Sequence, residues 1–223
     1  VPFILAWLKG TKKLVILHEK YARALDVVFG RLFNASLSYK VINPVESVYE
    51  ASNGFKIQGR VWLVDRRAYF YYLAKLFRPI NDIIFCSINT DFTPGCSLII
   101  VSKDRPKLID QAMAYSEQLE HVSIRGLEDF LMLTDNIVNA RRIFDGFIIG
   151  ELRNLRKSIL YLIVDYVEPN IEFYVEVNER DYTRTLPRIM TLVKNIVDKV
   201  SRISPRKTTI DTIKKLKRAL KVR

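Results

Sequence analysis

Histidine and glycine are scarce in this chain of 223 residues. The two histidines, His18 and His121, have no further potential ligand at a metal-binding spacing, so the sequence predicts no metal site and little imidazole chemistry. The eight glycines form none of the phosphate-binding or nucleophile motifs G-x-x-x-x-G-K-[ST], G-x-G-x-x-G and G-x-S-x-G. We therefore expect no catalytic residues, no enzymatic activity and no cofactor.

Cysteines and long apolar runs are also few. Cys86 and Cys96 lack a C-x-x-C spacing and are too few for a disulfide framework, which fits a reducing cytoplasm. No apolar run reaches the roughly 18 to 20 residues of a membrane span, so no membrane partner is expected. The apolar residues 1–8 lack the features of a signal peptide, and we interpret them as a buried edge strand or a docking segment.

Basic charge is concentrated in residues 206–223. The chain carries a formal net charge of +12, of which this tail, with eight basic residues and one acidic residue, contributes +7 and the remainder +5. The tail is expected to form an amphipathic, basic helix. Three roles stay open: the helix docks on the core, contacts nucleic-acid phosphates or binds an acidic protein surface. The candidate nucleic-acid contacts are Arg206, Lys207, Lys214, Lys215, Lys217, Arg218, Lys221 and Arg223.

Strand-like and helix-like segments alternate over the first 133 residues. Strands are expected at 13–18, 37–42, 59–65, 82–88, 97–102 and 121–125, with helices at 21–32, 68–77 and 104–119 and a helix or turn at 46–52. This alternation predicts an α/β fold with a predominantly parallel, Rossmann-like sheet and helices on both faces. We expect residues 1–133 to form that core.

A helix-rich region is expected at 134–205, packed on the core, with the basic tail helix at 206–223 as a third unit. The pattern predicts a long helical stretch at 127–167, a strand at 171–177 and a helix at 186–203. Apolar residues in this last helix form a packing seam, either internal or between molecules. The seam consists of Leu186, Ile189, Val193, Ile196, Val200 and Ile203.

Four short segments follow one another in an order that suggests a known family. They are residues 13–17 (KLVIL), 38–45 (SYKVINPV), 61–65 (VWLVD) and 82–89 (DIIFCSIN). Their order resembles that of the strands in the RecJ-like DHH phosphoesterase superfamily. Within it, the chain resembles the catalytically silent branch typified by the cell-division-cycle-forty-five subunit of the replicative helicase.

The resemblance implies an inactive phosphoesterase site. Active DHH enzymes hold two metal ions with acidic and histidine residues that follow the first, third and fourth strands. At those places this chain has His18, Asp65 and Asn89, of which only Asp65 is a carboxylate. A single carboxylate cannot hold two metal ions, so the resemblance implies a binding protein rather than a nuclease.

The resemblance further implies an accessory subunit of the archaeal replicative helicase that binds GINS and supports the MCM ring in DNA replication. Single-stranded DNA is a further candidate partner, and the expected location is the cytoplasm, at the nucleoid. Two alternatives stay open. One is a divergent DHH phosphoesterase or nuclease that uses Asp65 with unrecognised ligands, and the other is a stand-alone DNA- or RNA-binding protein that uses the basic tail.

Overall fold

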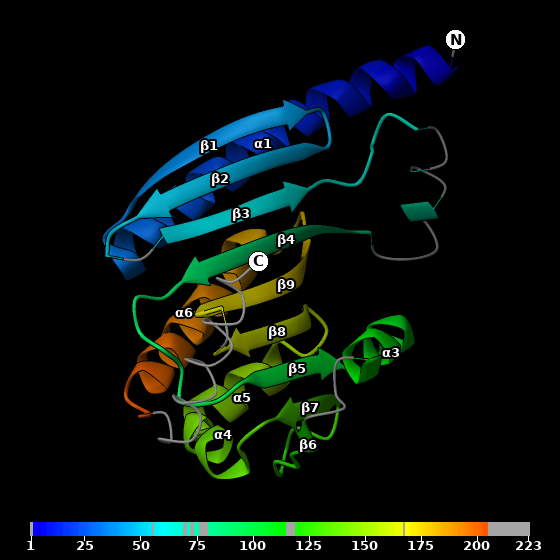
Figure 1. The fold of residues 1–223 in the computed structure, drawn as a ribbon. Helices are drawn as coiled ribbons and strands as arrows, with labels where there is room; N and C mark the ends of the chain where they lie inside the picture. The colour runs from blue at the N-terminus through cyan, green and yellow to red at the C-terminus, as the bar shows by residue number, and fades with distance from the viewer. Residues whose placement is uncertain are drawn as a thin grey trace, which may run out of the picture.

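A single nine-stranded sheet organises the chain (Figure 1). The computed structural model describes residues 2–204, except 55, 69–70, 72–73, 76–79, 115–118 and 167. The strand order is β1-β2-β3-β4-β9-β8-β5-β7-β6. The strands are β1 (Ser36–Asn43), β2 (Glu46–Ser52), β3 (Lys56–Trp62), β4 (Asn81–Asn89), β5 (Leu98–Ser102), β6 (Glu120–His121), β7 (Phe130–Thr134), β8 (Ile159–Asp165) and β9 (Asn170–Asn178). The helices are α1 (Pro2–Phe33), α3 (Pro106–Ala114), α4 (Ile137–Ile143), α5 (Gly146–Asn154) and α6 (Tyr182–Ser201).

All pairings between the described strands are antiparallel, so the expected parallel, Rossmann-like sheet was wrong. The first three strands follow one another through tight turns, and each turn reverses the chain. At the first turn the Asn43 side chain accepts a hydrogen bond from the Val45 amide, and at the second Gly54 adopts φ +72°. The expected helix or turn at 46–52 is β2.

The chain opens with one helix of 32 residues, where a strand at 13–18 and a separate helix were expected. The apolar run at residues 14–17 is compatible with either element, but the buried positions continue at intervals of three and four residues. They are Leu14, Leu17, Tyr21, Leu25 and Val28. This stripe packs α1 against the sheet, and the helix ends before Asn34, which adopts φ +49°.

The other expected strands and helices match the structure unevenly. Those expected at 37–42, 82–88, 97–102 and 171–177 coincide with β1, β4, β5 and β9. The strand expected at 59–65 overlaps β3, and only β6 forms where 121–125 was expected. The long helical stretch expected at 127–167 is instead β7, α4, α5 and β8, with Asn136 and Asp145 capping the two helices.

One face of the sheet is covered by α1 and α6, and α4 and α5 pack against α6 (Figure 1). The six expected seam residues, from Leu186 to Ile203, are all buried within one chain, so the described structure packs this seam internally. On the opposite face α3 covers β5 and β7 through a small second core around Val101 and Ala112.

The sheet crosses the boundary that was expected between residues 133 and 134. Strands β9 and β8 lie between β4 and β5, so residues on both sides of that boundary share one ladder of hydrogen bonds. The expected tail helix at 206–223, with all its candidate nucleic-acid contacts, lies outside the described residues.

Candidate functional site

A row of aromatic rings crosses the sheet face that faces away from α1 and α6. The alternation along β4 turns Ile84, Cys86 and Ile88 toward the helices and Phe85 toward the opposite face. The same alternation in the neighbouring strands places Trp62 of β3, Tyr174 of β9 and Tyr161 of β8 on that face. We call these four residues the aromatic row.

The rings of the aromatic row touch one another in sequence. The Phe85 and Tyr174 centroids lie 4.6 Å apart, and those of Tyr161 and Tyr174 lie 4.4 Å apart. Trp62 stacks on Tyr174 with an interplanar angle of 16°. Burial, together with the neighbouring Tyr174, raises the pKa of Tyr161. All four rings stay partly exposed, and among the described helices only α3 reaches the row, at Tyr161.

The aromatic row is bordered by charged side chains in which acidic residues outnumber basic ones. The strand register places Glu46, Glu50, Asp165, Glu172 and Glu176 on this face, against Lys40, Lys56 and Arg60, and Arg105, which follows β5, pairs with Glu176. Burial and the nearby carboxylates of Asp165 and Glu168 raise the pKa of Glu172. Acidic side chains therefore outnumber basic ones by one on this face, in a chain whose net charge is +12.

A buried ion network lies on the helical side at one end of the sheet. Arg66, which follows β3, is inaccessible to solvent and pairs with the equally buried Asp82 of β4. The Arg66 Nε also lies 3.3 Å from a Glu179 oxygen. Glu179 receives two further cations, since the Lys13 and Lys75 ammonium groups each lie 2.8 Å from its carboxylate. Burial opposes ionisation of Glu179, but the two lysines outweigh it and lower its pKa to about 2.

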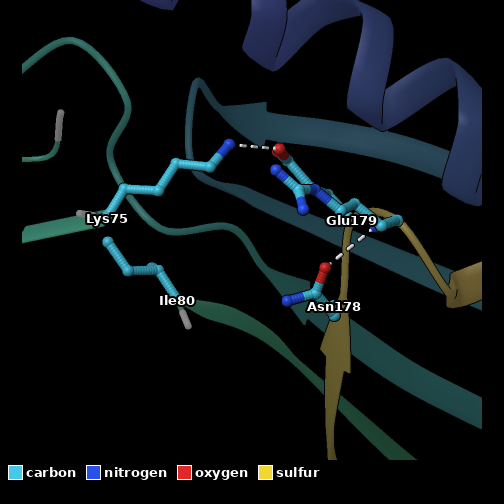
Figure 2. A pocket seen from close by; sticks show the side chains of 5 residues that line it. Lys75, Ile80, Asn178 and Glu179 are labelled. Atoms are coloured by element: carbon cyan, nitrogen blue, oxygen red, sulfur yellow. Dashed lines mark hydrogen bonds and ion pairs between the residues drawn. The ribbon is translucent and has the colours of Figure 1, made fainter. Parts of the chain in front are cut away.

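A small pocket beside Glu179 is lined by Lys75, Ile80, Asn178 and Arg180 (Figure 2). Its volume is about 130 Å³, space for a few water molecules, whereas pockets that bury a drug-sized ligand take roughly 300 Å³ or more. In Figure 2 Lys75 reaches across to the Glu179 carboxylate.

The three residues expected at a vestigial phosphoesterase site are not brought together. His18 is buried in the middle of α1, where its ring nitrogens contact the Tyr39 hydroxyl and the Pro44 carbonyl. Asp65 is exposed after β3 and pairs with Arg67. Asn89 ends β4, at the end of the sheet away from Asp65. Among the described residues no group of three or more histidine, cysteine or acidic side chains could hold a metal ion.

Both cysteines are buried free thiols. Burial raises the pKa of Cys86 and of Cys96 to about 12, so neither thiol is poised as a nucleophile at neutral pH.

Comparisons of the sequence and of the fold with known proteins do not identify a function for this site. No family model and no curated protein matches the sequence. One similar solved structure is the crystal structure of the mycobacterial trehalose monomycolate transport factor A, TtfA. It shares 9% identity, the match covers 77% of this chain and 73% of that chain, and the TM-score is 0.38. A likeness of this size supports no conclusion about function.

The aromatic row was not predicted from the sequence, although the alternation along β4 and β9 indicates which side chains share a face of the sheet. Residues 81–89 and 170–178 each place apolar side chains on one face and mixed polar and aromatic side chains on the other. The sequence does not indicate that β3, β4, β9 and β8 are neighbours in the sheet, and this adjacency is visible only in the folded chain.

Proposed function

We propose that this chain is a non-catalytic binding protein that docks a basic polypeptide segment on the open face of its sheet. The observation that carries the proposal is the aromatic row of Trp62, Phe85, Tyr174 and Tyr161, partly exposed and bordered by carboxylates. The earlier expectation of a protein that acts by binding macromolecules is kept here as a proposal.

The chemistry of the aromatic row selects the partner. Protein interfaces concentrate tryptophan, tyrosine and phenylalanine at their centres, and the faces of these rings attract lysine and arginine. The carboxylate of Glu172 on β9 adds an opposite charge for the same cations, while that of Glu176 is shared with Arg105. Four adjacent strands span about 14 Å, which accommodates one helix of about 10 to 12 Å diameter.

Nucleic acid fits this face less well. A stacking platform for single-stranded nucleic acid combines aromatic rings with a basic groove that follows the phosphates. On this face the acidic residues outnumber the basic ones by one, and the ion pairs Arg60–Glu46 and Arg105–Glu176 leave no continuous basic groove. Repulsion between phosphates and the carboxylates of Glu50 and Glu172 favours a protein partner.

The helicase-subunit hypothesis stays a prediction that the fold does not support. The family resemblance began with a strand at residues 13–17, and these residues lie within α1. Binding of GINS or of the MCM ring would be tested by co-purification with GINS at micromolar concentration. A divergent nuclease that uses Asp65 would show metal-dependent DNA or RNA degradation that is lost in Asp65→Ala.

The proposal is tested by a peptide titration that uses the chain's two tryptophans, Trp7 and Trp62. In the Trp7→Phe protein, Trp62 is the only tryptophan and lies within the aromatic row. The probe is a synthetic peptide with the sequence of residues 206–223, which is basic and amphipathic. We expect saturable quenching or a shift of the Trp62 emission, with micromolar affinity that weakens as salt increases.

The variant Tyr174→Ala should weaken peptide binding about tenfold or more, as expected for a central aromatic contact. The matched control is Phe147→Ala, which removes an exposed aromatic ring from α5 on the helical side and should leave the affinity unchanged. Circular dichroism confirms that both variants are folded. Binding of an 18-nucleotide oligo-dT but not of the peptide, or equal peptide affinity in Tyr174→Ala and wild type, would reject the proposal.

A further inference from the structure

The N-terminal end of α1 projects past the ends of β1 and β2 (Figure 1). Four large apolar side chains near this end are exposed: Ile4 is 66% accessible, Leu5 51%, Trp7 52% and Leu8 53%. Proteins rarely expose several neighbouring large apolar side chains to water, so this concentration marks a site of interaction.

The exposure follows from the side of α1 that meets the rest of the molecule. Ala6, Gly10, Leu14 and Leu17 recur every three or four residues and form the buried stripe. The first two members of the stripe are small, and Gly10 lies against the backbone of Arg66. The bulky residues Ile4, Leu5 and Leu8 lie outside this stripe and find no cover from the described part of the chain.

Positive charge surrounds the exposed apolar residues. Lys9 and Lys12 are exposed on the next turns of α1. Lys13 of the same helix contacts the Glu179 carboxylate, which also contacts Lys75 and lines the pocket of Figure 2. The exposed Arg180 lines the same pocket. Glu179 neutralises only part of this charge, so the end of the molecule stays basic.

An anionic lipid surface matches this combination of exposed apolar and basic residues more closely than a second copy of the chain does. Tryptophan prefers the boundary between headgroups and acyl chains, and lysine and arginine attract anionic headgroups. A second copy of the chain, packed helix to helix, would bring Lys9 and Lys12 close to the same residues of its partner. No described helix is long and apolar enough to cross a bilayer. An interfacial helix has no such requirement, since it lies along the surface and buries one face.

We propose that the N-terminal end of α1 docks the protein on the surface of an anionic membrane. Ile4, Leu5, Trp7 and Leu8 enter the boundary between headgroups and acyl chains. Lys9 and Lys12 contact the headgroups, and the exposed Arg180 adds a further cation at this end of the molecule. This surface is separate from the aromatic row, so either proposal can fail without the other. The earlier expectation of no membrane partner considered only spanning segments.

The test uses the full chain with Trp62→Phe, so that Trp7 is the only tryptophan. The probes are vesicles of phosphatidylcholine alone and of phosphatidylcholine with about 30% phosphatidylglycerol. We expect the anionic vesicles to shift the Trp7 emission to shorter wavelength and to sediment with the protein. Higher salt should weaken binding, because screening reduces the headgroup attraction.

Matched variants separate the apolar and the charged contributions. Ile4→Ser with Leu8→Ser should abolish the emission shift, whereas Val27→Ser, a 61% exposed position near the other end of α1, should leave it unchanged. Lys9→Gln, Lys12→Gln and Arg180→Gln should each weaken partition onto anionic vesicles about fivefold.

Two results would overturn the proposal. One is the absence of an emission shift with either kind of vesicle. The other is a concentration-dependent dimer in analytical ultracentrifugation that disappears in the Ile4→Ser, Leu8→Ser protein, together with no stronger binding to anionic vesicles than to phosphatidylcholine alone. In that case a second copy of the chain covers these residues.

Discussion

The Arg66 guanidinium holds the Asp82 carboxylate through two parallel contacts of 2.9 Å, and neither side chain is accessible to solvent. The same carboxylate accepts hydrogen bonds from the Tyr21 hydroxyl at 3.0 Å and from the Val64 amide at 2.9 Å. The pair thus connects α1, β4 and the segment after β3. Each charge is satisfied by several partners, which is the condition for keeping an ion pair in a protein interior.

Removing one member of this pair should destabilise the fold strongly. Asp82→Ala removes the two short contacts of the buried Arg66 guanidinium with a carboxylate and leaves it the longer 3.3 Å ion pair with Glu179, and we expect the free energy of unfolding to fall by about 3 to 5 kcal/mol in urea titrations. The control is Asp65→Ala, which breaks the exposed pair with Arg67 on the same connection and should cost less than about 1 kcal/mol. Similar losses in the two variants would contradict this account.

Two glycines of α1 should respond to alanine in opposite directions. Gly30 has open space around it, so Gly30→Ala should raise the free energy of unfolding by about 0.5 to 1 kcal/mol through helix propensity. A methyl group on Gly10 would collide with the Arg66 carbonyl. Gly10→Ala should therefore lower stability by about 1 to 3 kcal/mol. Stabilisation by both substitutions would show that α1 does not pack closely there.

His18 should make stability depend on pH below about 6.5. The Pro44 carbonyl can only accept, so His18 Nε2 carries the proton, and Nδ1 accepts from the Tyr39 hydroxyl. Burial lowers the pKa of His18 below 6.5, although the Pro44 hydrogen bond and Asp82 oppose the shift. The unfolded chain then takes up a proton first, and stability is lost as pH falls below 6.5.

Urea titrations at pH 7.5 and 5.5 measure this loss. His18→Gln should reduce the difference between the two pH values, while His121→Gln, at an exposed position, should preserve it. If the difference survived in His18→Gln, another group would be responsible.

The basic tail remains a candidate for nucleic-acid binding. If residues 206–223 contact phosphates, affinity for DNA should fall with the logarithm of salt concentration, with a slope of about −0.7 to −0.9 per phosphate neutralised. Deletion of these residues should flatten that slope by several units. An unchanged slope would exclude the tail as the DNA contact.

Individual strands could be located from the sequence because one-sided burial imposes a period of two residues. The expected segments at 82–88 and 171–177 coincide with β4 and β9. The order of the strands in the sheet could not be predicted, because that prediction depended on two local assignments. Residues 13–18 belong to a helix, and the Asn53-Gly54 dipeptide, a typical hairpin signal, was read only as a break. Without β2 the sequence seemed to alternate strand and helix.

The candidate site depended even more on tertiary structure. Trp62, Phe85, Tyr161 and Tyr174 come from two pairs of strands, β3 with β4 and β8 with β9, that lie far apart in the chain. Their rings meet because β9 lies between β4 and β8. Similarly, His18 follows a strand end only if residues 13–18 form a strand. In the helix, His18 turns instead toward Tyr39 and Pro44.

The central position of β9 has a consequence for synthesis of the chain on the ribosome. Until residues 170–178 emerge, β4 has no partner on one side, and β8 and β5 cannot join the first four strands. At about 5 to 20 residues per second, the nascent chain spends roughly ten seconds with an open strand edge after β4 is made. Such an edge is a template for pairing with another chain. From this strand order we expect folding to depend on chaperones during translation, and the chain to aggregate when translation stalls before residue 170.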